Sequence, residues 1–152
     1  LLGGDDMGFK TGPMIASRIL IESSFPWHKR NAALAHEHDK LYLLHACGNL
    51  SELMESLIQY VGIDGRHSFE DTIEPVTLAK ERYGDRIAVI GGIDLDFLCR
   101  ANETEIRQRV RETLDVCLPG GGYCLGTGNS VANYIPVENY LVMMDEGRRY
   151  SA

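Results

Sequence analysis

The stretch Arg86-Ile87-Ala88-Val89-Ile90-Gly91-Gly92-Ile93-Asp94 decides the fold class of this chain. After Arg86 the run is continuously apolar and rich in β-branched residues, a pattern typical of a strand buried on both faces. Strands of that kind lie in parallel sheets covered by helices. We therefore expect a central parallel strand at residues 86–90, with a loop of glycines and a carboxylate at its carboxyl end.

Strands and helices are expected to alternate along the whole chain. Apolar periodicity and breakers predict strands at residues 41–45, 63–67, 86–90 and 123–126 after a strand stub at Leu1-Leu2, and helices at residues 14–25, 27–38, 51–60, 73–83, 102–117 and 136–146. Pro26 is expected to end the first helix. Four complete βα units and a strand stub indicate a parallel sheet.

Every expected strand ends in small, polar or glycine residues. These ends are Asp5-Asp6 and residues 45–49, 66–68, 91–94 and 126–130. In a (βα)8 barrel the active site lies at the carboxyl ends of the strands. A doubly wound sheet is the alternative, but no GxGxxG motif follows the first strand to support a dinucleotide site. The expected fold class is therefore α/β, a (βα)8 TIM barrel.

The length predicts about half of such a barrel. A complete barrel needs about 250 residues, whereas this chain has 152 and begins with Leu1-Leu2-Gly3-Gly4, like the end of a strand. We expect residues 1–152 to be a single barrel-half fragment. Half a barrel exposes two sheet edges and part of its core, so we expect self-association through these edges or pairing with a missing N-terminal half.

Composition excludes several classes of function. The formal net charge of −7 argues against a nucleic-acid surface. Neither a membrane span nor a signal peptide is present in the sequence, which predicts a cytoplasmic protein. The four cysteines contain no CxxC pair, so thiols are expected rather than disulfides or a zinc ribbon.

His45 and Cys47 are the strongest candidate site residues. They stand two apart at the end of an expected strand, so they point to the same side of the sheet. A packed histidine and a buried thiol are the structural alternative. Their place at the active end of a strand favours a site with a metal or a nucleophile.

Acidic and polar residues at the other strand ends complete the candidate site. Asp5, Asp6 and Asp94 are expected to act in catalysis, although each also suits a turn. His67 is expected to be an acid–base group or to support a metal ligand, with a rim histidine as the alternative. The expected substrate-binding residues are Asn49, Asn129 and Ser130.

The ordered strand ends resemble the C-terminal half of the uroporphyrinogen decarboxylase superfamily. The resemblance rests on residues 4–8 (GDDMG), 44–49 (LHACGN), 91–94 (GGID), 120–123 (GGGY) and 135–139 (IPVEN), and it spans nearly the whole chain. It implies a (βα)8 barrel. The superfamily joins the haem-pathway decarboxylase to cobalamin-dependent methyltransferases that move methyl groups from corrinoid proteins to thiols.

The methyltransferase branch implies a zinc site. Its zinc is held by a His-x-Cys pair, which His45 and Cys47 match, and by a second cysteine in the loop after the last strand. That loop position falls on Asn129, which matches neither this cysteine nor the histidine of the decarboxylase branch. Cys124, five residues upstream, is a possible substitute ligand.

Three functions therefore stay open. The first is zinc-dependent methyl transfer from a corrinoid carried by a partner protein to a small-molecule thiol. The second is decarboxylation of a tetrapyrrole, uroporphyrinogen, which needs no cofactor. The third is a non-catalytic half-barrel that binds a partner. An isolated fragment is expected to be inactive by itself.

Overall fold

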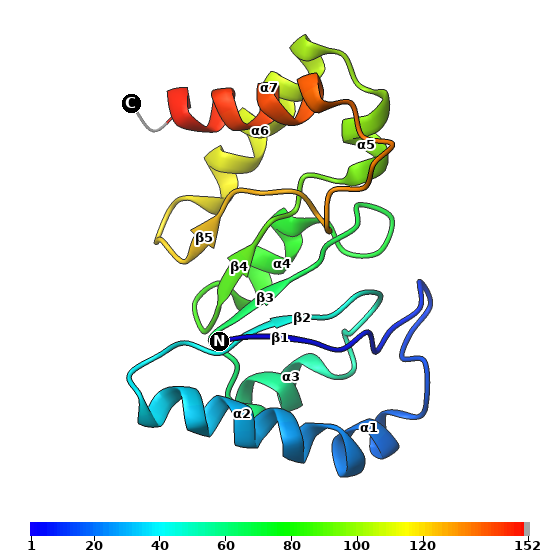
Figure 1. Cartoon of the computed structure of the whole chain (residues 1–152), viewed down its shortest axis with the longest axis vertical. Helices are drawn as coiled ribbons and strands as arrows, with labels where there is room; N and C mark the ends of the chain where they lie inside the picture. The colour runs from blue at the N-terminus through cyan, green and yellow to red at the C-terminus, as the bar shows by residue number, and fades with distance from the viewer. Residues whose placement is uncertain (151–152) are drawn as a thin grey trace.

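The computed structural model describes residues 1–150, which form a five-stranded parallel sheet with connecting helices (Figure 1). The strands are β1 (Leu2–Gly4), β2 (Leu43–His45), β3 (Gly65–His67), β4 (Ala88–Ile90) and β5 (Tyr123–Cys124). Their order in the sheet is their order in the chain, and every pairing is parallel. A doubly wound sheet reverses its strand order, so this sheet winds in one direction only.

At least one helix follows every strand, which confirms the α/β fold class. The helices are α1 (Ser17–Ser23), α2 (Phe25–Glu37), α3 (Met54–Ser56), α4 (Val76–Tyr83), α5 (Leu95–Arg100), α6 (Glu103–Cys117) and α7 (Val137–Tyr150), and α3 runs on into a π-helical turn, η1 (Leu57–Val61). The expected stub at the start of the chain is a full partner of the sheet, because β1 pairs with β2 over three residues.

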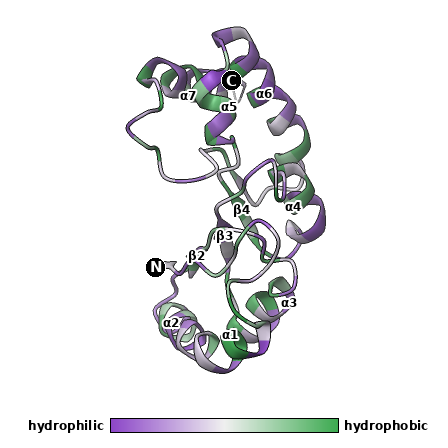
Figure 2. Ribbon diagram, turned by 90° about the vertical axis from the view of Figure 1, so that its right-hand side faces the viewer, coloured by the Kyte–Doolittle hydropathy of each residue, from purple (hydrophilic) through white to green (hydrophobic). Residues whose placement is uncertain are grey.

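Two apolar clusters hold the elements together. The larger one packs Leu44 and Val89 of the sheet against helix residues such as Phe25 and Leu57. The smaller one lies around α5, α6 and α7 and includes Val110. Figure 2 shows the strands crossing the middle of the molecule, with α1 to α3 at one end and α5 to α7 at the other.

Two predictions about helices are wrong. The first helix begins at Ser17 rather than near residue 14, because residues 8–13 fold back on themselves through a Gly8–Pro13 bridge. Pro26 does not end a helix but lies in the first turn of α2, where its missing N–H costs nothing. The expected elements also leave out α5, which follows Asp94.

Among residues 1–150, no helix has both the length and the apolar character needed to cross a membrane.

Candidate metal centre

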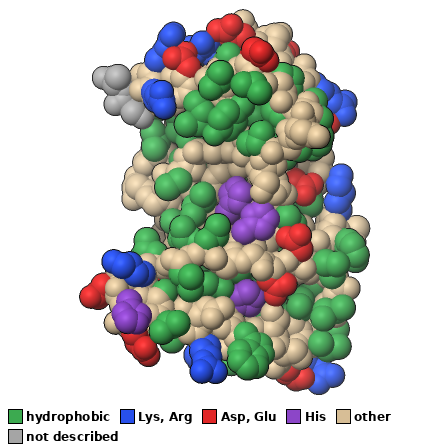
Figure 3. Space-filling model, viewed as in Figure 1, with side chains coloured by type: hydrophobic (Ala, Val, Ile, Leu, Met, Phe, Trp, Pro, Cys, Tyr) green, Lys and Arg blue, Asp and Glu red, His purple; other side chains and the backbone are tan. Residues whose placement is uncertain are grey.

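The register of the sheet brings the candidate histidines together. The last paired row runs from Gly4 through His45 and His67 to Ile90. Residues opposite one another in neighbouring strands point to the same face. His45 and His67 therefore lie side by side, with their ring centres 4.9 Å apart. Figure 3 shows histidine side chains near the centre of this face of the molecule.

Three side chains, His45 in this row and Asp6 and Cys47 just beyond it, converge on one point. The Nε2 of His45 lies 3.4 Å from the Sγ of Cys47 and 3.9 Å from the Oδ1 of Asp6. All three donor atoms lie within 4.8 Å of one another. Tetrahedral zinc, with bonds of 2.0–2.3 Å, separates its ligand atoms by about 3.3–3.8 Å. The separation of His45 from Cys47 lies within this range and that of His45 from Asp6 lies just above it, so the three side chains form a candidate metal site.

Close backbone packing brings Asp6 to the pair. Gly48 has a φ of 82° and lies against Gly8 so closely that a Cβ at either glycine would overlap the other loop. The amide of Gly8 donates to the carbonyl of Cys47 at 3.1 Å, and the amide of Cys47 donates to the Oδ1 of Asp6 at 3.2 Å. The loops after β1 and β2 are thus fastened together, and Asp6 comes to lie beside His45.

The sulfur of Cys47 receives two hydrogen bonds. The hydroxyl of Ser68 donates to it at 3.3 Å, and the Nδ2 of Asn129 donates at 3.2 Å. Burial raises the pKa of Cys47, and Asp6 also raises it, while the two donors lower it in part. The free side chain is thus a thiol, and a bound cation would favour the thiolate.

A buried ion pair lies beneath these loops. Arg66 of β3 is 1% exposed, and its Nη1 donates to the Oε2 of Glu74 at 2.9 Å. Its Nη2 donates to the carbonyl of Ser68 at 3.3 Å and reaches that of Gly48 at 3.5 Å. Arg66 therefore links the two segments that carry Cys47 and its donor Ser68. Sequence reasoning missed both Arg66 and Ser68, although both flank His67 at a strand end.

Asp5 lies outside the three-residue cluster. Its Oδ2 accepts from the Ser24 hydroxyl at 2.7 Å and lies 3.0 Å from the Nε2 of His28, whose Nδ1 lies 2.7 Å from the Tyr42 hydroxyl. Burial acts to raise the pKa of Asp5, but the hydrogen bonds from His28 and Ser24 bring it below its ordinary value. Asp5 fastens β1 to α2.

The side chains of Asp94 and Asn49 both accept hydrogen bonds from backbone amides. The Oδ1 of Asp94 accepts from the amides of Asp96 and Phe97 at the start of α5, and its Oδ2 accepts from the amide of Asp71. The Oδ1 of Asn49 accepts from the amide and the hydroxyl of Ser51. Asp94 therefore caps a helix, and Asn49 stabilises a turn.

Ser130 and Cys124 stay apart from the cluster. Ser130 is exposed, and its amide donates to the side chain of Asn129. Cys124 lies on β5, where it pairs with Ile90 of β4. Three strand spacings separate β5 from β2, which carries His45. Strands lie about 4.8 Å apart, so about 14 Å separates Cys124 from His45. Cys124 thus lies outside the cluster, and Asp6 is the third side chain that the structure brings to His45 and Cys47.

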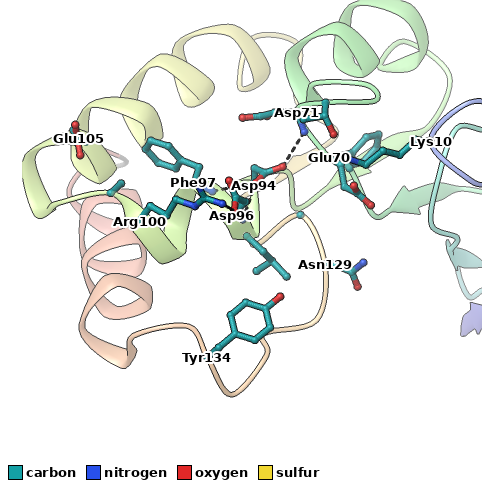
Figure 4. A pocket seen from close by; sticks show the side chains of 15 residues that line it. Lys10, Glu70, Asp71, Asp94, Asp96, Phe97, Arg100, Glu105, Asn129 and Tyr134 are labelled. Carbon is teal, nitrogen blue, oxygen red and sulfur yellow. Dashed lines mark hydrogen bonds and ion pairs between the residues drawn. The ribbon is translucent and has the colours of Figure 1, made fainter.

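An open pocket of about 910 Å³ is lined by α5 and by the loops that follow β3 and β5 (Figure 4). Asn129 lines it and connects it to the sulfur of Cys47. Two of its five carboxylates are paired with arginines: Asp71 with Arg109 and Asp96 with Arg100, each at 2.6 Å. None of the three cluster side chains lines this pocket, so Asn129 is its link to the candidate metal position.

Comparisons with known proteins agree with this architecture. A methyltransferase from Methanosarcina mazei superposes with a TM-score of 0.75 at 19% identity, over 99% of this chain and 42% of its own. A uroporphyrinogen decarboxylase from Cupriavidus pinatubonensis is 37% identical over 76 residues, covering 48% of this chain and 21% of that protein. The enzyme of the same name from Pseudoalteromonas atlantica is 32% identical over 127 residues, covering 82% and 35% respectively. This chain thus spans about a third or less of these two relatives.

The sequence profile of the family described as uroporphyrinogen decarboxylase (URO-D) matches residues 5–150. This match includes the ends of all the strands after β1 and all three side chains of the cluster. The chain belongs to the uroporphyrinogen decarboxylase family.

Proposed function

We propose that this chain is the C-terminal half of a (βα)8 barrel in a zinc-dependent methyltransferase that moves a methyl group from a corrinoid protein to a small-molecule thiol. The observation that carries this proposal is the cluster of Asp6, His45 and Cys47, whose spacing suits tetrahedral zinc. The likeness in fold to the Methanosarcina methyltransferase, at 42% of its length, supports the half-barrel.

Five residues of the site have distinct roles in this proposal. When bound, zinc lowers the pKa of a substrate thiol and holds it as the nucleophilic thiolate. Asp6, His45 and Cys47 supply three ligand atoms, which leaves one position for that thiol. Ser68 and Asn129 donate to the Cys47 sulfur and fix its direction. The pocket that Asn129 lines would admit the thiol.

Metal analysis and a methyl-transfer assay test this proposal together. The intact protein should contain one zinc per chain and should transfer a methyl group from methylcobalamin to a thiol. Cys47→Ala should lose both properties. Cys124→Ala, which removes an exposed thiol on β5, is the matched control and should keep both. Folded wild-type protein that holds no zinc after growth with the metal would refute the proposal.

Uroporphyrinogen decarboxylation is the second candidate, because the relatives found by sequence carry that name. It needs no metal. Asp5 and Asp6, at the end of β1, would then hold the pyrrole nitrogens of the tetrapyrrole during protonation. Loss of a carboxyl group from uroporphyrinogen by the metal-free intact protein would favour this reaction over methyl transfer.

We also propose that the open edges of the sheet are completed by another polypeptide, either a second copy or the other half of the barrel. Within residues 1–150, β1 and β5 each have a strand on one side only. Leu1 and Leu2 at the β1 edge are 59% and 68% exposed. Size-exclusion chromatography of residues 1–152 should show a dimer or larger species, whereas a stable monomer would contradict self-association.

A further inference from the structure

We infer that His67 is a positioning residue that holds His45 in the tautomer with its proton on Nδ1, so that the Nε2 lone pair faces Asp6 and Cys47. The inference deepens the proposed metal site, on which its functional consequence rests. The hydrogen-bond geometry itself does not depend on a metal.

The carbonyl of Thr127 determines which nitrogen of His67 carries a proton. A carbonyl oxygen only accepts hydrogen bonds. The Nε2 of His67 lies 3.1 Å from this oxygen, so it is the nitrogen of His67 that carries a proton. In a neutral imidazole the other nitrogen then has a lone pair and accepts. The Nδ1 of His67 is therefore an acceptor.

The contact between His67 and His45 then determines which nitrogen of His45 carries a proton. The two Nδ1 atoms of His67 and His45 lie 2.8 Å apart, a distance that requires one proton between them. Because the Nδ1 of His67 accepts, the Nδ1 of His45 donates.

The consequence appears at the opposite nitrogen of His45. Its Nε2 has no proton in this tautomer, and it is the atom that lies 3.4 Å from Cys47 Sγ and 3.9 Å from Asp6 Oδ1. A metal ligand must present a lone pair, and the hydrogen bond at the other ring nitrogen sets which tautomer is present. His67 thus prepares His45 for a cation.

The contacts from the Thr127 carbonyl through His67 to His45 form a hydrogen-bond relay, and Gly91 leaves the space that this relay requires. It has a φ of 86°, and a Cβ built on it would overlap the Thr127 carbonyl oxygen and lie 2.8 Å from the Cδ2 of His67. The pairing of His45 with His67 in the strand register holds the other side of the relay. Residues at the ends of β3, β4 and β5 therefore determine the orientation of the His45 imidazole.

The test reads the tautomer directly. Nitrogen-15 NMR of the imidazole rings, recorded on the intact protein with metal removed by a chelator at about pH 8, where unperturbed imidazole is neutral, separates protonated from bare ring nitrogens. Wild-type protein should show His45 protonated on Nδ1. A wild-type spectrum with the proton on Nε2 overturns the inference without the need for any variant.

Two substitutions separate positioning from packing. His67→Phe keeps a ring but removes the acceptor, and His45 should then shift toward the Nε2-protonated form. His67→Asp provides a group that only accepts, and His45 should keep its proton on Nδ1. His36→Phe, a change on α2 away from the site, is the control and should leave His45 unchanged. An unchanged His45 tautomer in His67→Phe overturns the inference.

Zinc titration then connects the tautomer to the site. His67→Phe should bind zinc about 10- to 100-fold more weakly than wild type, the usual effect of losing such a partner, and His67→Asp should restore most of the affinity. Equal affinity in His67→Phe and wild type overturns the inference. Wild-type protein with the Nδ1-protonated His45 and no zinc binding refutes the proposed function but supports the inferred relay.

Discussion

Replacing Glu74 by glutamine should be one of the most damaging single changes in the molecule. The carboxylate side chain is 10% exposed and faces Arg66, whose side chain is 2% exposed, across 2.9 Å. At an effective dielectric constant of about 20, two unit charges at this distance attract by about 6 kcal/mol. Glu74→Gln leaves the guanidinium buried without a counter-charge, which costs about 3–5 kcal/mol.

The chain contains a matched control for this prediction. Arg82 contacts the other oxygen of Glu74 at 3.4 Å, but its side chain is 50% exposed. An exposed ion pair contributes no more than about 1 kcal/mol, so Arg82→Ala should have a small effect. Arg66→Met with Glu74→Leu, which replaces both charges by apolar groups, should recover much of the stability.

Urea unfolding followed by circular dichroism measures these differences. Glu74→Gln should lower the free energy of unfolding by about 3 kcal/mol or more with an unchanged dependence on urea. A loss below about 1 kcal/mol, or one equal to that of Arg82→Ala, would show that the buried pair does not stabilise the loops around Cys47 as described.

Three further changes test separate parts of the structure. Gly91→Ala should lower stability by about 1–3 kcal/mol, because its positive φ strains any side chain and its Cβ meets Thr127; wild-type stability in thermal unfolding would contradict the close approach. Asn102→Ala removes the capping box of α6 and should cost about 1 kcal/mol in urea unfolding, so an unchanged midpoint would count against the cap. Hydrogen bonds from Arg111, and next from Arg107, lower the pKa of Glu146. Since its folded pKa lies below its unfolded value, Glu146 stabilises the protein fully above about pH 4.5 and loses this effect as the pH falls through the lowered value. Glu146→Gln should flatten the fall in stability below that pH, and an unaltered acid-unfolding profile would refute this role.

The sheet could be predicted because its signals are local. The apolar run at residues 86–90 and the spacing of His45 and Cys47 depend only on residues near one another in the chain, and the structure bears out the parallel strands. Asp94 carries a second local signal: an Asp followed at once by helix-forming residues also indicates an N-cap, and here it caps α5.

The composition of the candidate site depended on contacts that no local pattern contains. Asp6 meets His45 because the loops of Gly8 and Gly48 touch across 40 residues of sequence. Asn129 reaches Cys47 over a separation of 82 residues. The family resemblance places a third ligand at the position of Asn129, whereas the fold brings the carboxylate of Asp6 to the pair from the loop after β1.

X-ray absorption at the zinc edge tests most directly whether Asp6, His45 and Cys47 hold one metal. The zinc-loaded intact protein should show a single sulfur neighbour at about 2.3 Å, with nitrogen and oxygen neighbours at about 2.0–2.2 Å. Cys47→Ala should remove the sulfur, and Asp6→Ala should reduce the number of light neighbours by one. Two sulfur neighbours, or a zinc ion without any, would contradict this ligand set.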